Sequence, residues 1–154
     1  MHRLDDIDRA ILRHLQKNGR LSNTELAGRV GLSESASLRR VRILEEKGVI
    51  SDYVMLVNQA SVGKPGNVFV QVTLESQKQE MLEAFERAVE QVSEVMECYL
   101  MSGDQDYLLR VAVKDTEEYE RIHMAQLTRL PHVARLRSSF GLRTVVKKTD
   151  LPIP

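Results

Sequence analysis

Apolar residues recur at helical spacing through the first fifty residues, and this pattern predicts three short helices. One stripe at i, i+3, i+7 and i+11 defines the first helix, which Asn18-Gly19 ends. Its members are Leu4, Ile7, Ile11 and Leu15. Ser22 predicts an N-cap for the second helix, because Glu25 three residues later completes a capping box.

The second and third helices are separated by a turn that is typical of a helix-turn-helix. The turn reads Val30-Gly31-Leu32-Ser33, and its glycine accepts a positive φ at no steric cost. Ser33 predicts the next N-cap, and the third helix is expected to run to Lys47. Its expected buried stripe comprises Leu38, Val41 and Leu44.

The second half of the chain alternates with a period of two. Such alternation predicts half-buried strands, here at residues 68–74, 95–102, 107–113 and 133–146. Helical spacing predicts one helix over residues 78–92 and another from Asp115 or Thr116 to Leu130. The order β-α-β-β-α-β is that of a ferredoxin-like fold. The predicted class is therefore α+β, with a helix-turn-helix domain at 1–50, a strand at 53–57 and linker within 51–67, and a ferredoxin-like domain at 68–154.

Composition adds little to this picture, but charge adds an asymmetry. The 154 residues are 42% apolar and 29% charged, which is ordinary for a globular protein, and their formal net charge is zero. Residues 1–50 carry ten basic and seven acidic side chains, whereas residues 51–154 carry twelve and fifteen. A basic module joined to an acidic one favours two tasks in one chain. No apolar run is long enough to span a membrane and no signal peptide precedes the first helix, so we expect a cytoplasmic protein.

The third predicted helix carries hydroxyl and guanidinium groups away from its expected buried stripe. In a helix-turn-helix this second helix of the motif enters the major groove of DNA, where arginine binds phosphates or a guanine edge. The alternative is a solvated face on which the arginines pair with Glu45 and Glu46. The candidate DNA-binding residues are Ser33, Ser35, Ser37, Arg39, Arg40 and Arg42.

Several short motifs, in order along the chain, resemble the Lrp/AsnC transcriptional regulators of bacteria and archaea. The first half supplies Asn18-Gly19-Arg20-Leu21-Ser22, Val30-Gly31-Leu32-Ser33 and Gly48-Val49-Ile50. The second half supplies Cys98-Tyr99, Ser102-Gly103-Asp104-x-Asp106-Tyr107 and Val146-Lys147-Lys148-Thr149-x-Leu151-Pro152. Each motif is weak alone, but together they cover essentially the whole chain.

The resemblance implies a prokaryotic, nucleoid-associated regulator whose binding to double-stranded DNA, or whose assembly, is modulated by an amino acid. It also implies a homo-oligomer, a dimer that assembles further to an octamer. Two departures stand out. The family often has Pro-Thr-Pro-Cys where this chain has Glu34-Ser35-Ala36-Ser37, so no operator sequence is carried over. His132 replaces the usual glycine after Pro131, and a positive φ there would be strained.

The family's effector site falls on the segment between the second and third strands of the ferredoxin-like half. Gly103 would let a ligand approach the backbone, and Asp104 or Asp106 would accept from an ammonium group. The residues alone favour a β-turn whose aspartate caps its own backbone, and it is the resemblance that favours an effector pocket. With the last strand included, the candidate effector residues are Met101, Ser102, Gly103, Asp104, Asp106, Tyr107, Ser138 and Ser139.

The sequence offers no other chemistry. The histidines are scattered without metal-ligand spacing, no nucleophile or acid–base motif occurs, and Cys98 is expected to be a small buried side chain. We therefore expect no enzyme, no metal, no cofactor beyond an amino-acid effector, and no membrane partner. An amino-acid-binding regulatory subunit without a DNA role is the alternative function. Residues expected to cover an oligomer face are Phe69, Met101, Leu108 and Phe140.

Overall fold

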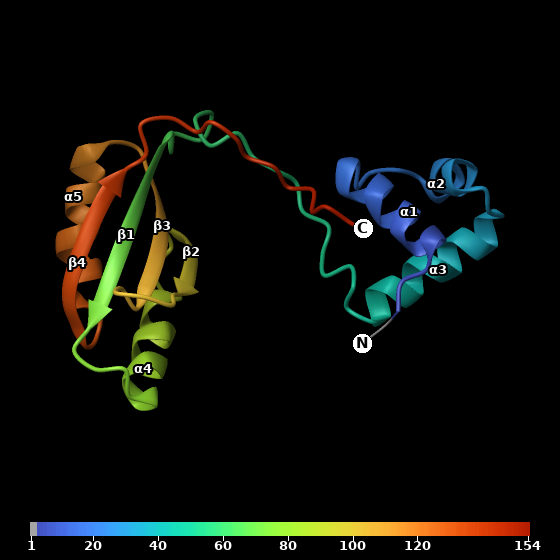
Figure 1. Ribbon diagram of the computed structural model, residues 1–154. Coiled ribbons are helices and arrows are strands. Elements are labelled where there is room, and N and C mark those ends of the chain that lie inside the picture. Colours follow the sequence, from blue (N-terminus) through green and yellow to red (C-terminus); the bar gives the residue numbers. More distant parts are fainter. Residues whose placement is uncertain (1–2) are drawn as a thin grey trace. The chain divides into compact units, whose positions relative to one another are not determined.

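The computed structural model describes residues 3–154, which form two compact units (Figure 1). The first unit contains the chain up to Leu56 together with residues 145–154, and the second contains residues 57–144. No helix in the described part is long and apolar enough to cross a membrane. Each unit has its own hydrophobic core.

The first unit consists of helices α1 (Asp6–Lys17), α2 (Asn23–Val30) and α3 (Glu34–Glu46). The predicted capping box is confirmed: the Ser22 hydroxyl accepts from the Glu25 N–H, while the Glu25 carboxylate accepts from the Ser22 N–H. Gly31 follows α2 in the left-handed conformation with φ of 69°. The turn between α2 and α3 therefore has the geometry that glycine was expected to permit.

The core of this unit joins α1, α2 and α3 around four buried side chains. These are Ile11, Leu12, Leu26 and Leu44. The inward face of α3 is not the expected one: Ser37 is fully buried, whereas Leu38 is 39% exposed. Packing rotates the helix away from the phase that its apolar residues alone would favour.

The segment between α3 and β1 contains no strand among its described residues. The strand predicted at 53–57 is therefore wrong, and the side chains of Val54, Met55 and Leu56 are exposed. The continuous apolar run Tyr53-Val54-Met55-Leu56-Val57 predicted a strand there, but a strand needs a hydrogen-bonded neighbour, and no ladder of the sheet includes these residues.

The second unit has the predicted β-α-β-β-α-β order. Its elements are β1 (Gly66–Leu74), α4 (Gln79–Val89), β2 (Val95–Leu100), β3 (Tyr107–Val113), α5 (Thr116–Ala125), a 3₁₀ turn η1 (Leu127–Arg129) and β4 (Val133–Phe140). The four strands form one antiparallel sheet in the order β2-β3-β1-β4. This is a ferredoxin-like sheet, with β2 and β4 at its edges (Figure 1).

Alternate residues of β1 show how the sheet separates core from surface. Val68, Val70 and Val72 are fully buried against side chains of α4 and α5. Phe69 is exposed, and Gln71 and Thr73 are partly exposed on the opposite face, which no helix covers. Both helices therefore pack on one face, and the second face is open.

The last strand is shorter than predicted and ends at Phe140 rather than at Val146. Gly141 donates to the carbonyl of Asn67 at 2.9 Å, and this contact lies at the start of β1. Beyond it β1 offers no further residues to pair with, so the ladder stops. His132, which precedes β4, has a φ of 61°, the left-handed conformation that was expected to be strained at a residue other than glycine.

The tail of the chain belongs to the first unit, which the sequence-based boundary of 68–154 did not anticipate. Gln16 of α1 donates to the carbonyl of Leu151 at 3.2 Å and accepts from its N–H at 2.7 Å. Arg13 donates to the carbonyl of Ile153 at 3.2 Å. The Ile153 side chain packs against the core cluster of the helices.

Candidate DNA-binding surface and effector pocket

Three of the six predicted DNA-binding residues form an exposed stripe on α3. Ser35, Arg39 and Arg42 are spaced i, i+4 and i+7, which places them on one side of a helix. All three side chains are exposed. Neither Arg39 nor Arg42 forms an ion pair within residues 3–154, so both guanidinium groups are available to a negatively charged partner.

Arg40 points the other way and ties α3 to the start of α1. Its Nη1 lies 2.8 Å from Asp5 Oδ2 and 2.8 Å from Asp8 Oδ1, and Asp8 is buried. The pKa of the Asp5 carboxyl lies below its ordinary value, chiefly because it accepts a hydrogen bond from the Asp8 N–H and also because it accepts one from the Arg40 guanidinium. Arg40 therefore holds α3 against the start of α1 and does not face outward. The sequence analysis grouped it with Arg39 and Arg42 as a DNA-binding candidate.

The two other predicted serines also have structural positions. The Ser33 hydroxyl accepts from the N–H of Ala36 at 3.3 Å and so caps α3. The Ser37 side chain is buried, which removes it from any DNA-facing surface, and its hydroxyl has no hydrogen-bond partner among residues 3–154. Sequence reasoning placed Ser37 outward because Leu38 was assigned to the inward stripe.

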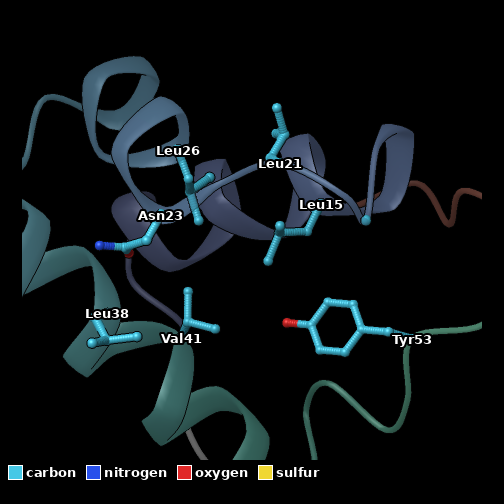
Figure 2. Close-up of a pocket in the computed structure, with 8 residues that line it drawn as sticks. Leu15, Leu21, Asn23, Leu26, Leu38, Val41 and Tyr53 are labelled. Carbon is cyan, nitrogen blue, oxygen red and sulfur yellow. The ribbon is translucent and has the colours of Figure 1, made fainter.

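A cavity of about 230 Å³ opens between the three helices and Tyr53 (Figure 2). Leu15, Leu26 and Val41 line it, and the exposed Leu38 lies at its side. The Tyr53 hydroxyl donates to Glu45 Oε1 at 3.0 Å. Burial of the ring raises the pKa of Tyr53, and the neighbouring Glu45 carboxylate raises it further, to about 12. Tyr53 therefore attaches the segment after α3 to α3 itself, a contact that the expected strand did not predict.

The loop between β2 and β3 contains most of the predicted effector residues, but two of them belong to the core. The buried Asp106 accepts from the Leu74 N–H and from Gln77 Nε2, both at 2.7 Å. Tyr107 is buried against Phe85, and its hydroxyl donates to Glu86 at 2.7 Å. These contacts anchor the loop to β1 and α4.

The remaining effector candidates divide between the loop and the two faces of β4. Ser102, Gly103 and Asp104 are exposed, and Met101 is partly exposed. Ser138 lies on the helix side, hydrogen-bonded to the Tyr119 hydroxyl of α5. Ser139 pairs with Phe69 on the open face. Asp106, Tyr107 and Ser138 are thus occupied by structural contacts, and the other five remain accessible.

Two more residues, Phe140 and Cys98, lie elsewhere than the sequence predicted. Phe140 makes an edge-to-face contact with Tyr119 on the helix side of the sheet, so it is not part of the open face. Cys98 is exposed on the edge strand β2 rather than buried, although desolvation by its surroundings raises the pKa of its thiol to about 11. The two edge strands leave these side chains with fewer neighbours than a central strand would.

A polar cavity of about 320 Å³ lies beside the loop on the open face of the sheet. Its walls are Gln71 and Thr73 of β1, Asp104 and Gln105 of the loop, and Arg135 and Arg137 of β4. Of these, only Asp104 was predicted from the sequence. The alternation of β4 was a usable signal for the two arginines, because residues i and i+2 share one face of a strand. Residues 3–154 contain no group of three or more histidine, cysteine or carboxylate side chains placed to hold a metal.

The two units together define a regulator that has a DNA-binding part and a ligand-binding part. Residues 4–51 match the family description "Winged helix-turn-helix DNA-binding". Residues 67–151 match "Lrp/AsnC ligand binding domain", which is more than half of the chain. The chain belongs to the Lrp/AsnC family of transcriptional regulators, as its motifs predicted.

Relatives match over nearly the full length. The chain is 42% identical over 153 residues to the Bkd operon transcriptional regulator of Pseudomonas aeruginosa, covering 99% of this chain and 100% of that protein. It is 43% identical over 150 residues to the leucine-responsive regulatory protein of Escherichia coli, covering 97% and 92%. A crystal structure of a transcriptional regulator from Neisseria meningitidis in complex with L-Met superposes with a TM-score of 0.92 at 35% identity, covering 97% of both chains.

Proposed function

We propose that this regulator binds double-stranded DNA through α3, assembles as a homo-oligomer, and changes its DNA affinity or assembly when an amino acid binds to its ferredoxin-like unit. The observation that carries the proposal is the exposed stripe on α3, where the guanidinium groups of Arg39 and Arg42 form no ion pair with any other of residues 3–154. In this proposal the protein acts in the cytoplasm of a prokaryote, at the nucleoid, and it catalyses no reaction.

The stripe explains how α3 would contact DNA. The side chains of Ser35, Arg39 and Arg42 point to one side, and a recognition helix contacts base edges chiefly through its N-terminal residues. Ser35 is therefore placed for a base or phosphate contact near the entry of the helix. The arginines bind phosphate oxygens or a guanine edge, and both contacts are strong because the donor is charged.

Oligomerisation is supported by the open face of the sheet. Phe69 is 40% exposed at its centre, and Tyr99 is 54% exposed on the edge strand β2. A ferredoxin-like sheet that carries aromatic side chains on an uncovered face is typical of a contact between copies. We propose that a second copy covers this face, as in a dimer that assembles further to an octamer.

The effector would act by binding two arrangements of the oligomer unequally. A ligand shifts such an equilibrium only by the difference of its affinities for the two states. The loop of Ser102, Gly103 and Asp104 is exposed, whereas the residues that follow it are fixed in the core. A ligand in the adjoining polar cavity would contact the exposed loop and the sheet together, which suits a coupling role.

The DNA-binding surface can be tested with variants of single arginines. Duplexes are first selected from a random pool by the wild-type protein, and affinity is then measured as a function of salt. Arg39→Ala and Arg42→Ala are expected to lower affinity about tenfold or more and to reduce the salt slope by about one each, because each removes one phosphate or base contact. Arg129→Ala, an exposed arginine of η1 in the second unit, is the matched control.

Arg40→Ala separates packing from DNA contact. Because Arg40 holds Asp5 and the buried Asp8, its removal is expected to lower the melting temperature, which the two outward variants leave unchanged. Affinity and salt slope that stay at wild-type values in both Arg39→Ala and Arg42→Ala would refute the proposed surface.

A further inference from the structure

The two chain segments that join the units are attached to the second unit at one residue, Asn67, near the start of β1. One segment enters the second unit after Leu56, and the other leaves it after β4 and rejoins the first unit at Val145 (Figure 1). The side-chain oxygen of Asn67 accepts from Gln59 Nε2 of the entering segment at 3.2 Å. Its main-chain carbonyl accepts from the N–H of Gly141, the first residue after β4, at 2.9 Å. Both connections therefore meet at an arrangement that we call the Asn67 junction.

The entering segment is folded onto the second unit before β1 begins. Gln59 is partly buried, and its amide also donates to the carbonyl of Gly66 at 3.1 Å. Residues 59–63 form turns, which the N–H of Lys64 closes by donating to the carbonyl of Gln59 at 2.9 Å. Lys64 Nζ lies 2.6 Å from Glu118 Oε1 in the first turn of α5. The chain is thus fixed to the second unit from Gln59 onward.

The sheet holds Asn67 itself in place. Asn67 pairs with Ala112 of β3, and its side-chain oxygen accepts from Arg110 Nη1 at 2.9 Å. Arg110 is fixed in turn, because it donates to Glu97 Oε1 of β2 at 2.8 and 3.0 Å. At Gly141 a Cβ atom would lie only 3.3 Å from the Asn67 carbonyl oxygen, so glycine permits this close approach. The polar groups of the junction pair with one another, and the junction is therefore compatible with a second copy on the open face.

The junction determines how long the entering connection is. Residues 59–65, seven in all, lie between the hydrogen-bonded Gln59 and the start of β1, and their release would lengthen the free chain. Seven residues of flexible chain have a root-mean-square end-to-end distance of roughly 13–16 Å. When two linked units bind two sites, the second meets its site at an effective concentration that linker length controls. A short connection therefore restricts the spacings at which both units can bind.

We propose that Asn67 is a positioning residue for DNA binding: it keeps the connections short, so that a dimer engages two half-sites at a restricted set of spacings. The proposal rests on the proposed function, because it concerns how the same DNA-binding unit is presented to DNA. Asn67 contacts no DNA in this mechanism and acts through the connections. Its effect is consequently confined to duplexes with two half-sites, since a single half-site is bound through α3 alone.

The test compares duplexes that carry one half-site or two, taken from the DNA that the wild-type protein selects. The spacing between the two half-sites is increased in single base-pair steps over one helical turn. The wild-type protein is expected to bind at least about tenfold more tightly at its preferred spacing than half a turn away, where the half-sites face opposite sides of the duplex. Asn67→Ala is expected to reduce this ratio to about threefold or less and to leave the affinity for one half-site unchanged.

Matched variants separate the junction from other effects. Asn67→Asp keeps an oxygen that accepts from Gln59 and Arg110, so it is expected to retain the wild-type ratio. Gln59→Ala releases the entering segment and is expected to lower the ratio, whereas Gln79→Ala, an exposed glutamine of α4, is the control. Melting temperature and molecular mass are measured for every variant. An Asn67→Ala protein that binds one half-site more weakly, or loses dimer mass, would overturn the positioning role.

A second measurement tests the junction without DNA. Nitroxide labels are attached to the full-length protein at Arg29→Cys in α2 and Glu90→Cys at the end of α4, with Cys98→Ser removing the native thiol. Double electron–electron resonance, recorded in an excess of unlabelled protein, gives the distribution of distances within one chain. Asn67→Ala is expected to broaden this distribution by about half its width, because the free chain is longer, and Asn67→Asp is expected to leave it unchanged.

The two measurements distinguish this inference from the proposed function. A broadened distribution in a protein that binds no selected duplex would uphold the junction and refute the proposed function. An unchanged distribution in Asn67→Ala would overturn the inference. An unchanged spacing ratio in an Asn67→Ala protein that binds DNA would also overturn it, and the proposed function would stand.

Discussion

Ser37 is a polar residue that lies in an apolar environment. Its side chain is fully buried in the three-helix core, yet its hydroxyl has no hydrogen-bond partner in the described part of the chain. A buried hydroxyl without a partner loses its hydrogen bonds to water on folding, at a cost of about 1–3 kcal/mol.

Ser37→Ala is therefore expected to stabilise the protein by about 1 kcal/mol, because alanine removes the unpaired hydroxyl and favours the helix. Urea unfolding followed by circular dichroism measures the change. Ser35→Ala, on the exposed side of the same helix, is the control and is expected to change stability by less than about 0.5 kcal/mol. A Ser37→Ala protein less stable than wild type would show that the hydroxyl has a bound partner.

The same residue shows where sequence reasoning about α3 failed. Leu38, Val41 and Leu44 are spaced by three and predicted an inward stripe, but an α-helix advances 3.6 residues per turn, so several phases bury two of these three. The structure buries Ser37 and Leu44 and turns Arg40 toward α1. The partners of Arg40, Asp5 and Asp8, lie at the start of α1, so no pattern within α3 contains them.

At the scale of elements, predictions succeeded where one segment carries its own signal. The N-cap of α2 and the glycine that ends it could be predicted from the sequence, because capping residues and glycines act on their nearest neighbours in the chain. Strand alternation likewise placed β1 and β3. The strand expected at 53–57 and the excess length of β4 failed because a strand depends on a neighbour distant in sequence. The arginines of the cavity were missed although the alternation of β4 places Arg135 and Arg137 on one face of the strand.

The contact between α1 and α3 makes the first unit sensitive to acid. The pKa of Asp5 is lowered by the Asp8 N–H and by Arg40, and that of Glu25 by its capping contacts with Ser22. A lowered folded-state pKa contributes stability that is complete above the unfolded value, near 3.8 for Asp5, and is lost as pH falls through the folded value.

The melting temperature of the first unit is thus expected to fall as pH is lowered from about 5 to about 3, the range that spans ordinary carboxyl pKa values and their depressed counterparts. Asp5→Asn keeps the N-cap but removes the charge, so its melting temperature is expected to depend less on pH. Asp6→Asn, a fully exposed carboxylate of the same turn, is the control. An identical pH profile in Asp5→Asn and wild type would contradict the role given to the ion pair.

At the scale of the whole molecule, the first unit is built from both ends of the sequence. Residues 145–154 join the helices, held by Gln16 at Leu151 and by Ile153 in the core. Sequence reasoning assigned the tail to the second unit, because chain order is the default guide to domains. Nothing in the tail's composition signals a partner more than a hundred residues away.

Ile153→Ala is expected to lower the stability of the first unit by about 1–2 kcal/mol, because it removes part of the apolar area buried against the helices. Hydrogen exchange followed by mass spectrometry is expected to show faster exchange in α1 and unchanged exchange in β1 and β3. Val146→Ala, whose side chain is 70% exposed, is the control. Uniform acceleration in both units, or none in α1, would contradict the docking of the tail.

The return of the tail has a consequence for how the protein is made. The ribosome releases the helices of the first unit early, but the segment that completes their packing is translated only after the whole second unit. The part made first is therefore finished last. A chain that ends early, by premature termination or by proteolytic trimming, is expected to have helices α1, α2 and α3 without the segment that packs against them.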